Sequence, residues 1–300
     1  MLGKELPSPK DTVSDECVFE FVEASSDAST LVPRRSHEGL LQAEVAIDME
    51  HENTADELAL FDATSRHAIS LWKKSRNITG RSDDPKMFSI LLFKRLLSNH
   101  RGYALLFNEK LQTESDIVLR SGIETSICLA ANYELREKFV LLLHGDAIFT
   151  LKGQIKMCRD EGSAEMVSHS EAALRDVQSR FQGDVKPARL DWKSLAEHGR
   201  VPHLYSWHRM LSGLSSHVTG ASILTAVAPA DGPNPADDLT PLQRKMHLMM
   251  MAGATLQGCL RHGGMLSDET ACGETVELLT RLSDLSWDWP GVTGRPQGAG

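Results

Sequence analysis

The sequence predicts an all-α protein, a single multi-helix bundle of about eight or nine helices. Three observations support this fold class. Apolar residues recur with helical spacing along most of the chain, convincing alternation of apolar and polar residues is absent, and helix start and stop signals separate the apolar runs. The apolar fraction of 41% and the charged fraction of 24% are typical of a soluble globular protein.

Composition divides the chain into three parts. Residues 1–50 are polar and acidic without a sustained period, and we expect a largely disordered, mobile arm. Residues 51–289 are expected to form the helical domain, and 290–300 a flexible tail. The acidity is local: residues 1–62 hold 15 acidic and 4 basic side chains, whereas the rest of the chain holds 26 acidic and 28 basic ones.

Capping signals place the first two helices. Thr54 followed by Glu57 is typical of a capping box and predicts a helix over the periodic residues that follow. Asp84 and Pro85 offer an N-cap and a first-turn proline for the second helix. Gly102 is expected to end that helix.

Glycines divide the middle of the chain. A long helical run is predicted over 103–144, where Gly145 and Asp146 should interrupt it before it continues. Gly162 and Ser163 should stop that continuation and cap the next helix.

The last third contains a connector, a loop and four more helices. Residues 183–191 are the predicted connector, followed by a short helix at 192–199 and a long one from 203. Residues 228–238 read as a loop, closed by a capping box at 240–243 with a proline at its first helical position.

The final two helices are expected at 242–264 and 273–287. The methionine-rich run at 246–251 is predicted to lie in the core, although a dimer seam is the alternative. This stretch is also too short and too polar to cross a membrane, and the N-terminus has no secretory h-region. We therefore expect a cytoplasmic protein.

Several chemistries lack their motifs. The sequence contains no GxGxxG after a strand, no P-loop, no HExxH and no GxSxG, and its five cysteines form no CxxC pair. We therefore expect no cofactor, no metal and no disulfide framework. His198, His203, His208 and His217 are spaced by 5, 5 and 9 residues, which does not stack two of them one turn apart on one face. Surface and capping roles are predicted for them.

Arg120 and Glu124 lie one helical turn apart and face the same side. Ile117, Ile127 and Cys128 flank that face, which predicts partial burial. Buried charges need partners, so the first interpretation is an internal ion pair between helices. The second is an acid and a cation in a cleft, with Glu124 as a base or Arg120 as an anion-holding group.

Gly213, His217 and Gly220 fall on one helical stripe. A glycine inside a helix costs roughly 1 kcal/mol relative to alanine, so two of them suggest close packing against a neighbouring helix. We expect His217 to enter that seam and bond a carboxylate such as Glu124. Arg209, on another stripe of the same helix with Tyr205, Ser212 and Ser216, is expected to line a cleft beside it.

These motifs together resemble a bacterial family known as domain of unknown function 5677. An arginine-serine-x-x-glutamate helix, a tryptophan segment and a serine-rich helix near a histidine occur in order over roughly residues 60–228. The matching positions are Arg120, Ser121, Glu124, Trp192, Tyr205, Ser212 and His217. The resemblance implies an all-helical bacterial protein without an assigned activity, and the "VTG" after the histidine departs from the immediate glycine of the family.

Two classes of function remain open from the sequence. The first is a regulatory or interaction module in which Arg120, Glu124 and His217 form an internal polar network. The second is a hydrolase, in particular a ribonuclease, in which these residues act with Arg209. The "RLLSNH" stretch from Arg95 also fits the Arg-x4–6-His spacing of helical nucleotide-binding nucleases. A protein partner, RNA and a second copy of the chain all stay open as partners.

Overall fold

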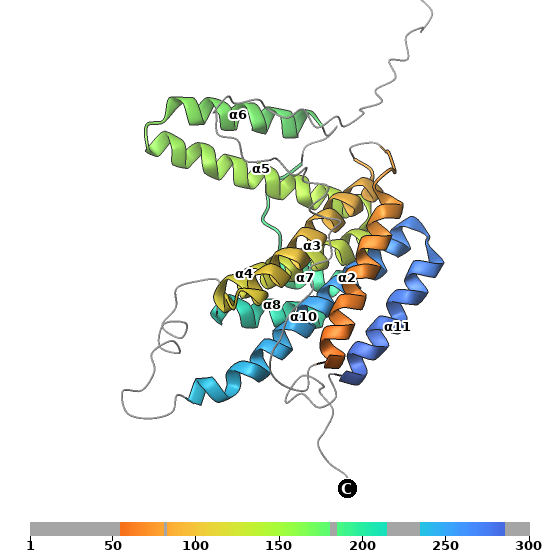
Figure 1. Ribbon diagram of the computed structural model, residues 1–300. Coiled ribbons are helices and arrows are strands. Elements are labelled where there is room, and N and C mark those ends of the chain that lie inside the picture. The colour runs from red at the N-terminus through yellow and green to blue at the C-terminus, as the bar shows by residue number, and fades with distance from the viewer. Residues whose placement is uncertain (1–54, 81–82, 181–184, 215–234, 286–300) are drawn as a thin grey trace, which may run out of the picture.

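The computed structural model describes residues 55–80, 83–180, 185–214 and 235–285 (Figure 1). These ranges contain nine α-helices and no strand, which confirms the predicted fold class. The predicted arm and tail lie outside the described residues.

The bundle is built around three helices that pack on one another, α3 (Pro85–Asn108), α4 (Gln112–Leu135) and α10 (Pro235–Leu266). Two further helices, α2 (Ala55–Ser75) and α11 (Glu269–Leu285), lie together along one side of α10 (Figure 1). On the other side, α4 carries the short helices α7 (Trp192–His198) and α8 (Pro202–Leu214).

The methionine-rich run lies in the core, as predicted. Met249, Met250 and Met251 are at most 2% exposed, and they belong to a cluster with large side chains such as Phe93 and Phe107. This cluster draws residues from every described helix except α6.

Helix α3 begins at the predicted cap but ends later than predicted. The Asp84 side chain accepts a hydrogen bond of 2.8 Å from the Lys86 N–H, and Pro85 occupies the first turn. Gly102, however, lies inside α3, which continues to Asn108. Within the described ranges, a Cβ at Gly102 would meet the Val118 side chain alone, at 3.6 Å, so no close packing against another element requires a glycine here.

The predicted break at Gly145 and Asp146 is wrong, because α5 (Glu137–Asp160) runs through both residues. The predicted run over 103–144 is broken twice, at 109–111 between α3 and α4 and at Arg136, whose φ of 54° separates α4 from α5. Gly145 instead makes room for the connector, since a Cβ there would lie 2.9 Å from the Lys186 carbonyl oxygen. Asp146 accepts a 3.0 Å hydrogen bond from the Leu190 N–H. Both residues therefore serve a tertiary contact.

Helix α6 (Ala164–Ser179) folds back on α5 to form a hairpin that projects from the bundle (Figure 1). The turn between them follows the prediction at Gly162, whose φ is 75°, although the Ser163 side chain does not cap α6. Ser170 is the one buried residue of α6. The sequence predicts a single bundle, and the α5–α6 hairpin extends beyond it.

The C-terminal helices confirm the order of elements and shift two helix starts. The short helix α7 lies where it was expected, and α11 begins at Glu269, four residues before the expected start. Helix α10 includes Pro235, so the described part of the predicted loop, residues 235–238, is helical, and so are Thr240 and Pro241. Within the described helices, no segment has both the length and the apolar character needed to cross a bilayer.

Candidate functional site

Arg120 and Glu124 form the predicted ion pair, and an imidazole from α8 joins them. Arg120 Nη2 lies 3.2 Å from Glu124 Oε1, and each side chain is 23% exposed. Nε2 of His208 lies 3.0 Å from the same oxygen, and this side chain is 7% exposed. The Arg120–Glu124 pair therefore lies within α4, and His208 on the same carboxylate oxygen makes the link between α4 and α8.

His208 was expected to have a surface or capping role, and this prediction is wrong. The ring packs between aromatic residues of α7 and α8, with centroids 5.7 Å from Trp192 and 6.2 Å from Tyr205. Ser212, one turn on, donates a 2.7 Å hydrogen bond to the His208 carbonyl oxygen. Positions far apart in the sequence motif thus meet at one place, which we call the Glu124 cluster: Arg120, Glu124, Trp192, Tyr205 and His208.

Local sequence explains how α7 reaches this cluster. Asp191 caps α7 by accepting a 3.1 Å hydrogen bond from the Lys193 N–H. Gly199 ends the helix against α4, where an added Cβ would lie 2.8 Å from the Ala130 Cβ and 2.9 Å from the Ala131 nitrogen. The missing side chain at Gly199 lets α7 approach the α4 backbone and places Trp192 beside His208.

Most of the glycine seam predicted for the helix of Gly213 stays untested. His217 and Gly220 fall outside the described residues, so the contact between His217 and Glu124 stays a prediction. Within the described part of the chain, no heavy atom comes within 4 Å of a Cβ built at Gly213. Close approach occurs on α10, where such a Cβ at Gly258 would lie 2.1 Å from Leu96 and one at Gly264 would lie 2.8 Å from Tyr133.

Arg209 does not join the Glu124 cluster. It is exposed, one residue after the buried His208, and a step of one residue turns about 100° around a helix. The described structure therefore separates Arg209 from the Glu124 carboxylate, which it was expected to assist.

A second carboxylate–imidazole pair, which the sequence did not predict, lies near the N-terminus of α4, one turn before Arg120. Asp116 Oδ1 lies 2.7 Å from His247 Nδ1, and the two residues are 4% and 0% exposed. Gln112 donates a 2.8 Å hydrogen bond to the same carboxylate oxygen. This pair joins α4 to α10 inside the core, closed to solvent.

Two more buried histidines bond hydroxyl groups instead of carboxylates. His100 lies between Ser65 on α2, at 2.7 Å, and Thr255 on α10, at 2.8 Å. His262 lies 2.8 Å from the Ser89 hydroxyl, linking α10 to α3. Burial lowers the pKa of each imidazole to about 3, because no charged partner offsets the loss of hydration. Both rings are therefore neutral at pH 7.

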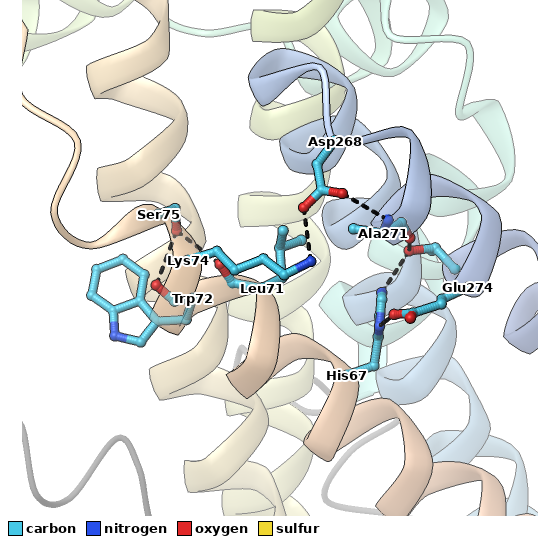
Figure 2. Close-up of polar contacts among 9 residues, drawn as sticks. His67, Leu71, Trp72, Lys74, Ser75, Asp268, Ala271 and Glu274 are labelled. Carbon is cyan, nitrogen blue, oxygen red and sulfur yellow. Dashed lines mark hydrogen bonds and ion pairs between the residues drawn. The ribbon is translucent and has the colours of Figure 1, made fainter.

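The fifth buried histidine joins α2 to α11 (Figure 2). His67 Nε2 lies 2.7 Å from the Thr275 hydroxyl, and Nδ1 lies 3.1 Å from Glu274. Burial lowers the pKa of His67, and the Glu274 carboxylate opposes that shift. About two turns further along α2, Lys74 pairs with Asp268 at 3.0 Å. Apolar neighbours at helical spacing were the available sequence signal for these core histidines.

The arginine–histidine spacing proposed for a nuclease ends at a buried residue. His100 is 5% exposed, and its ring stacks on Phe61 with 4.3 Å between centroids. Both ring nitrogens already have hydroxyl partners. The His100 ring consequently presents no nitrogen to a substrate from the position that the structure gives it.

Cavities of the described residues lie beside the Glu124 cluster and along the hairpin. One of about 390 Å³ is lined by Asp146, Phe149 and Arg189 and is bounded by Trp192. Another, of about 450 Å³, lies between α5 and α6. Among the described residues, no three His, Cys, Asp or Glu side chains are grouped as a metal ion would require.

Comparison of the chain with protein families, with curated proteins and with solved structures found no match.

Proposed function

We propose that this chain is a protein-interaction module in which the α5–α6 hairpin binds a protein partner and the helical bundle holds the hairpin in place. The observation that carries the proposal is the incomplete burial of the hairpin. Its second helix, α6, has 16 residues and buries one, Ser170. A helix that packs on one neighbour leaves the rest of its surface for another contact.

Apolar side chains mark this surface. Met157 on α5 and Met166 on α6 are each 53% exposed, on either side of the turn at the end of the hairpin. Methionine side chains are unbranched and polarizable, and they adapt to irregular partner surfaces. This chemistry fits a partner that offers an apolar helix or groove.

The Glu124 cluster supports a structural role under this proposal. Its carboxylate oxygen is engaged by both Arg120 and His208, which hold α8 on α4. Among the described residues, Nδ1 of His208 is buried without a hydrogen-bond partner, so the ring presents no free nitrogen to solvent. A general base would need an accessible atom within hydrogen-bond reach of its substrate.

The proposal also places the protein in the bacterial cytoplasm and leaves self-association as one form of the interaction. The cytoplasmic location is supported by the free thiols of the described cysteines. Burial raises the pKa of two of them, Cys128 and Cys259. Buried unpaired thiols are typical of reducing compartments.

The test is site-specific photo-crosslinking with the full chain in cells. A photoreactive side chain at Met166 should capture a discrete partner, and Met157→Glu should abolish that product. The same side chain at Glu277, exposed on α11, is the control. Equal products from both positions, or a product that survives Met157→Glu, would contradict a hairpin interface.

A hydrolase is the competing function, and the same purified protein tests it. Wild type, Glu124→Gln and His208→Gln are assayed on RNA and on a phosphodiester substrate, with folding checked by thermal unfolding. The interaction proposal expects no turnover by any of the three. Turnover by wild type that both folded variants lose would establish the Glu124 cluster as catalytic.

A further inference from the structure

A basic groove follows the inner face of the α5–α6 hairpin, in its outer half. Lys152, Lys156 and Arg159 line one wall at spacings of four and three residues along α5, and Arg175 on α6 faces them. The groove has a volume of about 450 Å³, and Ile155 and Leu174 contribute its apolar lining. Residues four and three apart share a helix face, so the three α5 cations form one stripe.

The groove holds more positive charge than its own carboxylate balances. Glu171 is the one acidic lining residue, and its carboxylate lies 2.6 Å from Arg159 Nη2. Three cations of the lining therefore remain without a carboxylate inside the groove. A groove of this kind suits an acidic peptide that also carries apolar side chains.

The chain itself contains such a peptide. Residues 11–30 include six carboxylates and no lysine or arginine. They also include the apolar stretch Cys17–Val22, "CVFEFV", in which one glutamate interrupts four large apolar residues and a cysteine. Charge and apolar character thus both match the groove, whereas the rest of the chain after residue 62 is nearly neutral.

The connecting length allows the two to meet. Residues 31–54 separate this peptide from Ala55 at the start of α2, and 24 residues of extended chain reach about 80 Å. Helices α2 and α5, with 21 and 24 residues, would together measure about 68 Å if placed end to end. The groove is therefore within reach of the peptide on the same molecule.

We propose that residues 11–30 bind in the basic groove between α5 and α6 of the same chain. The carboxylates pair with Lys152, Lys156 and Arg175, and the apolar residues cover Leu174. This inference stands on the charge and lining of the groove, independently of the partner proposed for the end of the hairpin.

The test is photo-crosslinking of the purified full chain with a photoreactive side chain at Lys152. Mass spectrometry should find the cross-link within residues 11–30. A photoreactive side chain at Lys193, exposed on α7, is the control and should not reach that peptide. Mixing isotopically labelled and unlabelled protein separates cross-links within a chain from those between chains.

Charge reversal then identifies the contact. Lys156→Glu combined with Arg175→Glu should lower the yield about tenfold, because repulsion replaces several exposed ion pairs. Lys138→Glu combined with Lys193→Glu makes the same change in net charge outside the groove and should leave the yield unchanged. Asp15→Lys, Glu16→Lys and Glu20→Lys should restore the yield in the reversed groove.

Three results would overturn the proposal. One is a folded protein with no cross-link from Lys152 to residues 11–30. Another is a cross-link found only between labelled and unlabelled chains. The third is a yield that the groove reversal and its control change equally.

Discussion

The ring of Phe61 lies almost parallel to the imidazole of His100, with 4.3 Å between centroids and 13° between planes. The same arrangement recurs between Phe93 and His262, at 4.3 Å and 15°. In each case a serine one turn away on the helix of the phenylalanine bonds the imidazole. The core therefore holds two neutral histidines where a helical bundle usually places apolar residues.

This arrangement predicts loss of stability in acid. The pKa of His100 and of His262 is about 3 in the folded protein against 6.5 for an ordinary imidazole, so the unfolded chain takes up protons first as the pH falls. Stability should be complete above pH 6.5 and decline towards pH 3, by up to about 1.4 kcal/mol per pH unit for each histidine.

Urea unfolding at a series of pH values measures this decline. His100→Gln and His262→Gln should each lower stability at pH 7 and make the decline shallower between those pH values. His169→Gln, on the exposed surface of α6, should keep the wild-type slope. A wild-type slope in the two core variants would show that other groups cause the acid effect.

The contact between His208 and Glu124 predicts energetic coupling between α8 and α4. Loss of either side chain should cost about 1–3 kcal/mol, since the remaining partner stays largely buried. A double-mutant cycle with His208→Ala and Glu124→Ala should give a coupling energy above about 0.5 kcal/mol. The exposed pair of Lys193 and Glu197, 3.9 Å apart, is the matched control and should couple near zero.

Close approach at Gly199 predicts a cost for any side chain there. In Gly199→Ala the new Cβ would meet the α4 backbone, which cannot move as a side chain does, so we expect a loss of about 1–3 kcal/mol. Gly153→Ala on α5 meets no atom of the described residues within 4 Å and should gain roughly 0.5–1 kcal/mol from helix propensity. Thermal unfolding of both variants measures the difference; equal effects would show that α7 moves away freely.

The bond from the Leu190 N–H to Asp146 predicts that this carboxylate anchors the connector before α7. Asp146→Ala should expose residues 185–191 to proteolysis and speed hydrogen exchange at Leu190 several-fold, because the amide loses its acceptor. Asp146→Asn keeps an acceptor oxygen and should remain close to wild type. Exchange at Leu190 that is the same in all three proteins would exclude an anchoring role.

Features that depend on local residue preferences could be predicted from the sequence. The N-cap at Asp84 and the turn at Gly162 follow from the preferences of single residues, and the buried methionines follow from a continuous apolar run. Gly145 and Asp146 do not mark a helix break because these residue types serve tertiary contacts here. Both residues contact a connector about 40 residues later, and a local pattern does not show it.

The sequence also predicted the partner of Glu124 only in part. The sequence identified the arginine–glutamate turn and the helix that supplies an imidazole, and the structure places His208 of that helix on the carboxylate. His208 and His217 are nine residues apart, about two and a half turns of an ideal helix, so they would face opposite sides. The face of α8 that packs on α4 depends on how Trp192 and Gly199 position α7 and α8. Periodicity in the sequence does not give that position.

The single residue Arg136 joins two helices of 24 residues each, and its φ of 54° is a conformation that few side chains adopt readily. Because one residue connects the two helices, the position of α4 fixes the direction and the rotation of α5. One residue inserted beside Arg136 would change the direction in which α5 leaves α4, and the hairpin would then present Met157 and the basic stripe on another side of the bundle.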